Sequence, residues 1–543
     1  MRRDWLYILA IVWLALLLSV LLAGMLQWKA SNQVFAAVWI AGFFFVALNV
    51  CYLLVVCLCS VFVKPRLLPE TSGSRVVRVA VLYVVKNERG DLASLMARTL
   101  AGNEHALTDL WLISNSDDQQ MLSHEESLVR ALRGQFGRDR VHFYRPERNP
   151  LGRKHVAIQR WAADHVEYAY FIVCDADSVL FPDSVSKLIA KAEHTANARF
   201  MVFQSHLEIT GSQTRFARFL EPGQNIVQKV FCNINFAMFG QSPYYGHGAL
   251  IRRAPFAQLQ VPEAVLSHDL WDTAAVDMAG WGIAFCPDVK THEMFPPDYI
   301  EFRRRSRRWI VGTLEAWPLL FRRGLSLGTR FHIGLAQYIY VVQPVFIIWM
   351  LLGLLARSTL AGPLLQTQSV FLGGSSALDF EMGGVSVFTV GLVWTYKLRF
   401  TRSLNEALLV LRDVLTGTAV LLNNLFYDSL FIVAAPWTPR SWLPMPKESM
   451  HQRTFKECFG LMFPSTCFGA VLTWVGWVVD PRWMLYSSPV LFSFLFGSVM
   501  VYWTAKPGRR SESRLLPGPD SSWRERWLTP GTVLDERPQG ARD

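Results

Sequence analysis

The sequence has few cysteines: eight among 543 residues, and no two of them form a CxxC pair. This argues against a zinc site and against a disulfide framework. Apart from a Gly/Ser patch at residues 373–376 there is neither a low-complexity linker nor an internal repeat, and the polar tail after Thr504 is too short for another domain. No intramembrane charged pair or inverted repeat supports a transporter, although a transporter or membrane scaffold on a degenerate nucleotide fold stays an alternative.

The chain has fewer acidic than basic residues: 43 aspartates and glutamates against 54 lysines and arginines, which gives a net charge of +11. A basic chain can bind nucleic acid, but this one contains no module of the kind that reads DNA or RNA. Its basic residues gather beside hydrophobic runs, where they set membrane orientation and meet anionic lipid. We therefore expect membrane lipid, and no nucleic acid, among its partners.

Hydrophobic sequence is what the chain has in excess. Hydrophobic residues make up 51% of it, and the mean hydropathy is +0.22. A membrane crossing needs ~20 apolar residues, so the sequence predicts an integral membrane protein with seven or eight spans. The apolar blocks are Trp5–Leu26, Val34–Val63, Phe331–Leu355, Gly384–Tyr396, Val414–Ala435, Gly460–Val479 and Leu485–Thr504.

Basic residues at the outer ends of the first two blocks predict a retained hairpin with both ends in the cytoplasm. A cleaved signal peptide is the alternative for the first block, but that block is too long for an h-region and no small-x-small site follows it. Basic residues also flank both ends of the last hairpin. We therefore expect residues 404–437 to be re-entrant or a tight pair of short helices, with Asn423 and Asn424 near the turn and residues 439–456 under the soluble domain.

Between the second and third blocks the composition changes to that of a soluble α/β domain, in which β-rich runs alternate with charged helical stretches. Its size suits one nucleotide-handling domain. The predicted division is an N-terminal transmembrane hairpin at 1–66, a cytoplasmic α/β domain at 75–323, a C-terminal transmembrane domain at 324–505 and a cytoplasmic tail at 506–543.

Two buried-strand patterns at the start of this domain end in polar residues. Residues 76–85 precede Asn87 and Glu88, and residues 110–114 precede Asn115 and Asp117. Polar groups at the carboxyl ends of parallel strands are where open α/β sheets bind ligands. Every doubly wound fold has several such strands, so the pattern alone is weak evidence for a site.

Asp175 and Asp177 end the apolar run 170–174 and are the stronger signal. Two carboxylates this close repel each other, so such a pair usually has a cation or a basic partner. Mg²⁺ or Mn²⁺ held by few protein carboxylates and by substrate phosphates fits the pair. A helix cap followed by a turn residue is the simpler alternative.

Three shorter motifs allow two interpretations each. Lys154, in Gly152-Arg153-Lys154, approaches phosphates or lies in a solvated turn. The glycines of Gly246-His247-Gly248 let a ligand approach the backbone or simply form a turn. Asp269, after Ser267 and His268, is a general base or the N-cap of the helical stretch that follows, and a helix N-terminus would also keep such a carboxylate ionised.

Residues 302–309 contain five arginines and end in Trp309. A basic helix on the membrane surface explains the charge. The tryptophan indicates more, because an aromatic face is a usual platform for a sugar and arginine suits a diphosphate. Arg305 and Arg308 precede Trp309 in this run.

The order of these motifs resembles the D, DxD, TED, QxxRW pattern of the processive, cellulose-synthase-like members of glycosyltransferase family 2. Asn115 stands for the first Asp, His268 for the Glu and Arg305 for the Gln. The departures at His268 and Arg305, with Tyr244–His247 and Ala279–Gly282, are similar to the branch that makes osmoregulated periplasmic glucans. The likeness runs from about residue 75 to the tail. The chain lacks the long N-terminal extension associated with that branch.

The resemblance implies an α/β GT-A glycosyltransferase domain inserted in an α-helical multi-span membrane domain of the bacterial inner membrane. It implies an inverting UDP-glucose-dependent enzyme, with Mg²⁺ or Mn²⁺, that extends a β-glucan, β-1,2-linked by branch likeness, and passes it outward. A periplasmic glucan-processing protein and acyl carrier protein are partners by the same likeness. The implied roles are base for Asp269; donor binding for Asn87, Glu88, Asn115, Asp117, Lys154, Asp175, Arg305 and Arg308; acceptor binding for Trp309, Gly246, His247 and His268; and metal binding for Asp175 and Asp177.

Two other enzymes share most of these motifs. A non-processive transferase with a lipid-phosphate acceptor would need neither the RxxRW element nor so many helices after the domain. Another processive polysaccharide synthase, such as a cellulose-like one, differs in how the acceptor hydroxyl is presented, which motif spacing does not reveal.

Overall fold

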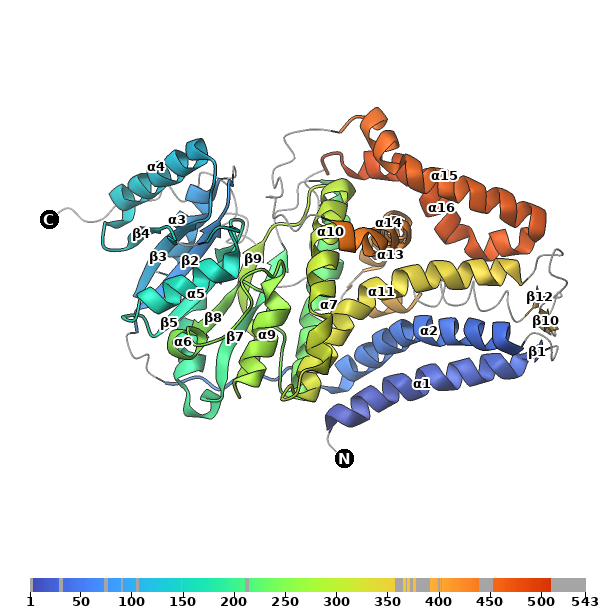
Figure 1. Ribbon diagram of the computed structural model, residues 1–543, viewed down its shortest axis with the longest axis horizontal. Coiled ribbons are helices and arrows are strands. Elements are labelled where there is room, and N and C mark those ends of the chain that lie inside the picture. The colour runs from blue at the N-terminus through green and yellow to red at the C-terminus, as the bar shows by residue number, and fades with distance from the viewer. Residues whose placement is uncertain are drawn as a thin grey trace.

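The computed structural model divides the chain into an α/β domain and a bundle of long helices (Figure 1). The structure describes residues 3–28, 33–72, 77–88, 91–103, 107–147, 149–209, 214–356, 365–367, 369–371, 375–376, 391–398, 401, 403–438 and 453–508. The predicted architecture, an α/β domain between flanking membrane-length helices, is confirmed.

The α/β domain is built on an eight-stranded mixed sheet with the order β4-β3-β2-β5-β8-β7-β9-β6. The first four strands in this order are parallel, whereas β8 is antiparallel to both β5 and β7. The strands are β2 Val79–Val85, β3 Thr108–Ser114, β4 Val141–Tyr144, β5 Tyr170–Cys174, β6 Val179–Leu180, β7 Phe200–Ile209, β8 Ala249–Arg252 and β9 Gly282–Glu293.

Helices cover both faces of this sheet, which explains the unbroken apolar runs in the sequence. Every residue of β2 is buried. Val79, Val81 and Tyr83 belong to one hydrophobic cluster, and Ala80 and Leu82 to another. Successive side chains of a strand point to opposite faces, so a strand buried on both faces must be apolar throughout. The helices of the domain are α3 Leu92–Gly102, α4 Gln119–Phe136, α5 Lys154–Asp164, α6 Ser184–Glu193, η2 Thr195–Asn197, α8 Arg253–Phe256 and α9 His268–Met278.

Two amphipathic helices, α7 (Arg215–Phe239) and α10 (Tyr299–Glu315), stand between the sheet and the bundle. Figure 1 shows them running across the direction of the long apolar helices. Phe216 of α7, Tyr299 of α10 and Met462 of the bundle share one buried cluster. This packing joins the α/β domain to the membrane helices.

Six described helical segments are long and apolar enough to cross a membrane: Arg3–Ala23, Gln33–Phe62, Leu327–Leu355, Leu404–Trp437, Phe455–Val479 and Pro481–Thr504. They comprise α1 Arg3–Met25, α2 Gln33–Phe62, α11 Leu327–Leu355, α13 Leu404–Leu421, α14 Asn423–Ala434, η5 Ala435–Trp437, α15 Phe455–Val479 and α16 Pro481–Thr504. A fold with several membrane-length helices fits a membrane protein. The structure also describes the short elements η3 Trp317–Phe321, β1 Leu26–Trp28, β10 Leu365–Thr367, β11 Ser369–Phe371 and β12 Ser375–Ser376.

The segment 404–437 consists of two helices that meet at Leu422, directly before Asn423. How often it crosses the membrane stays a prediction. Residues 391–396 of the predicted span Gly384–Tyr396 are helical. Residues 384–390, residues 373–374 of the Gly/Ser patch, the segment 439–452 and the tail after residue 508 lie outside the described residues.

Candidate active site

The parallel strands β2, β3 and β5 are neighbours and end at the same edge of the sheet. The residues that follow them, Glu88, Asn115 and Asp175, line a cavity of about 720 Å³. Lys154 at the start of α5 lines it as well. This is the place where open α/β sheets bind ligands.

Asn87 and Asp117 do not line this cavity. The Asn87 side-chain amide donates a hydrogen bond of 2.5 Å to Asp117, whose side chain is 70% exposed. Asn115 does line the cavity, and its side-chain oxygen accepts a hydrogen bond of 2.9 Å from Asn149. Of Asn115 and Asp117, both expected to bind the donor, Asn115 therefore lies in the cavity and Asp117 does not.

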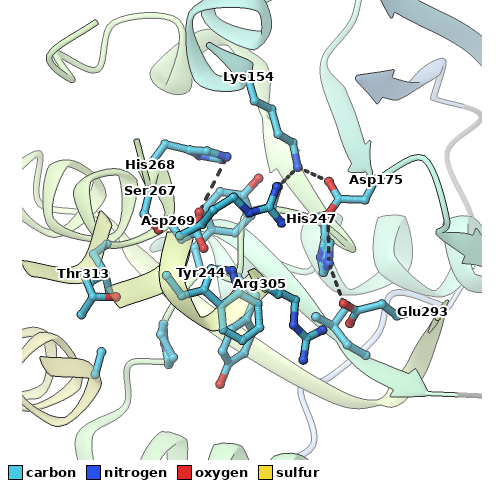
Figure 2. Close-up of a pocket in the computed structure, with 18 of the residues that line it drawn as sticks. Lys154, Asp175, Tyr244, His247, Ser267, His268, Asp269, Glu293, Arg305 and Thr313 are labelled. Carbon is cyan, nitrogen blue, oxygen red and sulfur yellow. Dashed lines mark hydrogen bonds and ion pairs between the residues drawn. The ribbon is translucent and has the colours of Figure 1, made fainter. Parts of the chain in front are cut away.

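Asp175 is surrounded by basic groups (Figure 2). Lys154 forms an ion pair with its carboxylate, and His247 Nε2 lies 3.5 Å from Oδ2. Lys154 also donates to the carbonyl of Gly246 at 2.8 Å. The lysine ammonium thus lies where a cation is needed beside the strand tip.

Asp177 is only 5% exposed and, like Asp175, lines the cavity. Among the described residues no group of three or more His, Cys, Asp and Glu side chains is arranged to hold a metal. Two carboxylates are nevertheless what a hard cation takes from a protein when substrate phosphates supply its remaining ligands. Lys154 pairs with Asp175, which shows that these carboxylates need a positive charge beside them. The residues therefore fit a divalent cation bound together with a diphosphate.

Asp269 is the second residue of α9, and Ser267 occupies the N-cap position, so Asp269 is not the cap. It projects into the cavity from the first turn of the helix. Thr273 donates to the Asp269 backbone carbonyl at 2.7 Å and accepts from the backbone of Tyr244 at 3.0 Å. These two bonds tie the start of α9 to the Tyr244–Gly248 loop.

His268 lies beside Asp269 but is turned inward. Its Nδ1 is 2.7 Å from Oδ2 of Asp272, which is 1% exposed. Burial lowers the pKa of His268, but the carboxylates of Asp272 and Asp269 offset this and the pKa is raised. Burial raises the pKa of Asp272, and His268 opposes that shift.

The far wall of the cavity comes from α10. Arg305, Arg308 and Trp309 line it because residues three and four positions apart share one face of a helix. The Arg305 guanidinium lies 4.4 Å from the centre of the Trp309 ring. Burial lowers the pKa of Arg305, although Glu293 counteracts the shift.

The other arginines of this run do not line the cavity. Arg303 and Arg307 lie over the rings of Tyr427 and Phe431 of α14, and the Arg304 side chain is 61% exposed. Both interpretations of this run therefore hold, each for one side of α10. Arg303, Arg304 and Arg307 belong to a basic helix surface, and Arg305 and Arg308 belong to the cavity.

Three side chains in or next to this site were not predicted from the sequence as site residues. Glu293 at the end of β9 lies 3.8 Å from His247 Nε2 and lines the cavity. Asp272 lies behind His268, one helical turn along, and this i, i+4 spacing was the available signal. Arg453 bonds to Asp298 and Glu301 at the start of α10, which are 155 and 152 positions away in the chain, and nothing local in the sequence indicates these contacts.

The cavity continues from the strand ends toward the membrane helices. Tyr52 of α2, Asn235 of α7 and Tyr340 of α11 line its other end. Asn235 donates to the Tyr52 hydroxyl at 3.3 Å and accepts from Tyr7 of α1 at 3.2 Å. Hydroxyls, amides and aromatic faces are the groups that a sugar chain contacts.

A GT-A domain with acidic strand tips, a carboxylate at a helix start and a cavity open toward membrane-length helices defines the class of membrane-associated glycosyltransferases. Residues 170–437 match the family model described as "Glycosyl transferase family group 2". This region, about half of the chain, is thus similar to that family.

Curated relatives named glucans biosynthesis glucosyltransferase H match about half of the chain. The protein from Bradyrhizobium diazoefficiens is 30% identical over 315 residues, which are 54% of this chain and 41% of the relative. The protein from Pseudomonas paraeruginosa is 29% identical over 329 residues, 55% of this chain and 37% of the relative. The matched region thus spans less than half the length of these relatives.

Among solved structures, a mannosyltransferase from Pyrobaculum calidifontis in complex with GDP-Man and Mn²⁺ aligns with a TM-score of 0.47 and 12% identity. The alignment covers 74% of this chain and 98% of that one.

Proposed function

We propose that the protein transfers glucose from UDP-glucose to a growing β-glucan and passes the chain outward across the bacterial inner membrane. The observation that carries this proposal is the single cavity that runs from Asp175 at the strand tips, past Asp269, to Tyr340 among the membrane helices. The names of the curated relatives support glucose as the sugar and a glucan as the product. The likeness to their branch favours β-1,2 linkage.

The donor diphosphate would lie between the strand tips and α10. Lys154, Arg305 and Arg308 supply positive charge on opposite sides of this space, and such charge-assisted contacts orient a diphosphate. Asp175 and Asp177 would hold Mg²⁺ or Mn²⁺, which when bound neutralises charge on the departing diphosphate.

The acceptor would lie between Asp269 and Trp309. Trp309 is 43% exposed, and its ring offers a platform for a sugar. Asp269 would accept the proton of the acceptor hydroxyl as its oxygen attacks the anomeric carbon in a single in-line displacement that inverts the configuration. Gly246 and His247 would line the acceptor side.

The orientation of the α/β domain follows from charge. Basic residues flank the first hairpin and the last one, so these flanks and the domain would be cytoplasmic. The donor would then be bound on the cytoplasmic side, and the glucan would leave on the other side. Acyl carrier protein and a periplasmic glucan-processing protein are proposed partners by branch likeness.

The test is incubation of the purified full-length protein with radiolabelled UDP-glucose and Mg²⁺, followed by linkage analysis of the product. We expect a water-soluble β-glucan, and UDP-N-acetylglucosamine and GDP-mannose serve as control donors. A labelled product that partitions into organic solvent would instead indicate a lipid-phosphate acceptor. No transfer from any UDP-sugar would contradict the proposal.

A further inference from the structure

Directly behind Asp269 lies a buried pair of side chains, His268 and Asp272. They are one turn apart on α9, and the distance from His268 Nδ1 to Asp272 Oδ2 is 2.7 Å. Because the carboxylate accepts this hydrogen bond, Nδ1 carries a proton and the ring orientation is fixed. Within the part of the chain that the structure describes, Oδ1 of Asp272 has no hydrogen-bond partner, so His268 is the group that this buried acid holds.

The second ring nitrogen of His268 faces Asp269. Nε2 lies 3.7 Å from Oδ1 of Asp269 (Figure 2), a distance that a small rotation of either side chain would close to a hydrogen bond. Contacts around a general base are often long before the reacting groups are bound. The three side chains thus form a row, Asp272–His268–Asp269, that leads from the domain interior to the cavity.

The surroundings of His268 favour its charged form. Both carboxylates raise its pKa against the effect of burial. From α5, Lys154 opposes this shift, and the ring of His155 stacks at 5.9 Å. Burial lowers the pKa of His155 to about 3, so His155 is neutral. Tyr244, from the loop, lies edge-on at 6.3 Å.

We propose that His268, held by Asp272, is a positioning residue that keeps Asp269 ionised and turned toward the acceptor. This inference rests on the proposed function. In the transfer step the acceptor O–H bond breaks and its proton passes to Asp269, while the acceptor oxygen bonds to the anomeric carbon. The bond from that carbon to the diphosphate oxygen breaks, and its electron pair leaves with the diphosphate. His268 gives up no proton in this step, and its positive charge stabilises the carboxylate beforehand.

The test compares the pH dependence of kcat for the full-length protein and the His268→Gln variant, with UDP-glucose as donor. The wild type should lose activity at high pH as His268 loses its proton. The His268→Gln variant has no imidazolium to lose a proton, so this high-pH limb should disappear.

The Asp272→Asn variant is a second test of the inference. It removes one of the carboxylates that raise the pKa of His268, so the high-pH limb should move to lower pH and not vanish. His155→Gln is the matched control, because it removes a stacked but neutral ring, and the high-pH limb should stay in place. Thermal unfolding of each variant shows whether it is folded.

The possible failures are distinguishable. A folded His268→Gln protein with the wild-type pH profile overturns the inference, and a higher acceptor KM at unchanged kcat would make His268 an acceptor-binding residue instead. Absence of sugar transfer by the wild type overturns the proposed function itself.

Discussion

Gly246 lies so close to Asp269 that a β-carbon at this position would come within 2.9 Å of Oδ1. Gly246 also has a positive φ of +78°, and its carbonyl accepts a hydrogen bond from Lys154. One backbone position therefore touches both the proposed base and the lysine that pairs with Asp175. The close approach explains why this loop needs a residue without a side chain.

Gly246→Ala should lower turnover strongly by displacing Asp269. Gly280→Ala is a matched control, because Gly280 has a φ of +79° but no atom within 4 Å of an added β-carbon. Both variants should lose about 1–2 kcal/mol of stability from the left-handed backbone, and only Gly246→Ala should lose turnover. Equal turnover in the two variants would show that the contact with Asp269 is unimportant.

Asp269→Asn should leave UDP binding largely intact and reduce turnover at least ~100-fold, the usual contribution of a general base. Asp277→Asn, on the same helix but away from the cavity, is the control. Calorimetry with UDP and a product assay measure the two effects. Near-normal turnover of Asp269→Asn would exclude it as the base.

Asp177→Ala should abolish the Mg²⁺ dependence of UDP affinity, because the diphosphate then meets a site that no longer holds the cation. We expect Mg²⁺ to strengthen UDP binding to the wild type by roughly tenfold or more, about 1.4 kcal/mol. Asp139→Ala, at an exposed position, should behave as wild type. If calorimetry finds equal wild-type affinity with and without metal, the assignment of Asp175 and Asp177 is wrong.

Arg453→Gln should destabilise the protein and impair turnover. The Arg453 side chain is 13% exposed and bonds to Asp298, the N-cap of α10, at 2.6 Å and to Glu301 at 2.5 Å. Removing one partner of a buried ion pair costs about 3–5 kcal/mol. The same helix carries Arg305 and Trp309, so its displacement should also raise the KM for the acceptor.

Arg304→Gln is the control for Arg453→Gln. Arg304 pairs with the same Glu301 at 2.7 Å, but its side chain is 61% exposed, and such surface pairs contribute at most ~1 kcal/mol. The midpoint of thermal unfolding in detergent compares the two variants. A similar small shift for both would show that Arg453 does not hold α10.

The topology prediction concerns residues 404–437. If this segment does not cross the membrane once, a cysteine placed at Ser449 should be inaccessible from the periplasm. Labelling of intact cells with an impermeant thiol reagent tests this, in a background that lacks the exposed Cys467. Labelling at position 449 would establish a single crossing.

The sequence by itself determined the fold class and the composition of the strand tips. Residues 170–174 form an apolar strand that must be buried on both faces, so Asp175 and Asp177 could only follow at its end. The membrane-length helices could also be predicted from the sequence, because a membrane crossing needs ~20 consecutive apolar residues in one segment. Such local patterns need no knowledge of distant contacts.

Only the tertiary structure decided which of these groups meet. Lys154 and Asp175 are 21 residues apart, and Arg453 and Asp298 are 155 apart. It also placed Asn115 in the cavity and Asp117 outside it, and it separated Arg305 and Arg308 from their basic neighbours. The physical reason is that ion pairs and close backbone approaches depend on the spatial arrangement of strands and helices. Spacing along the chain restricts that arrangement only within one strand or one helix.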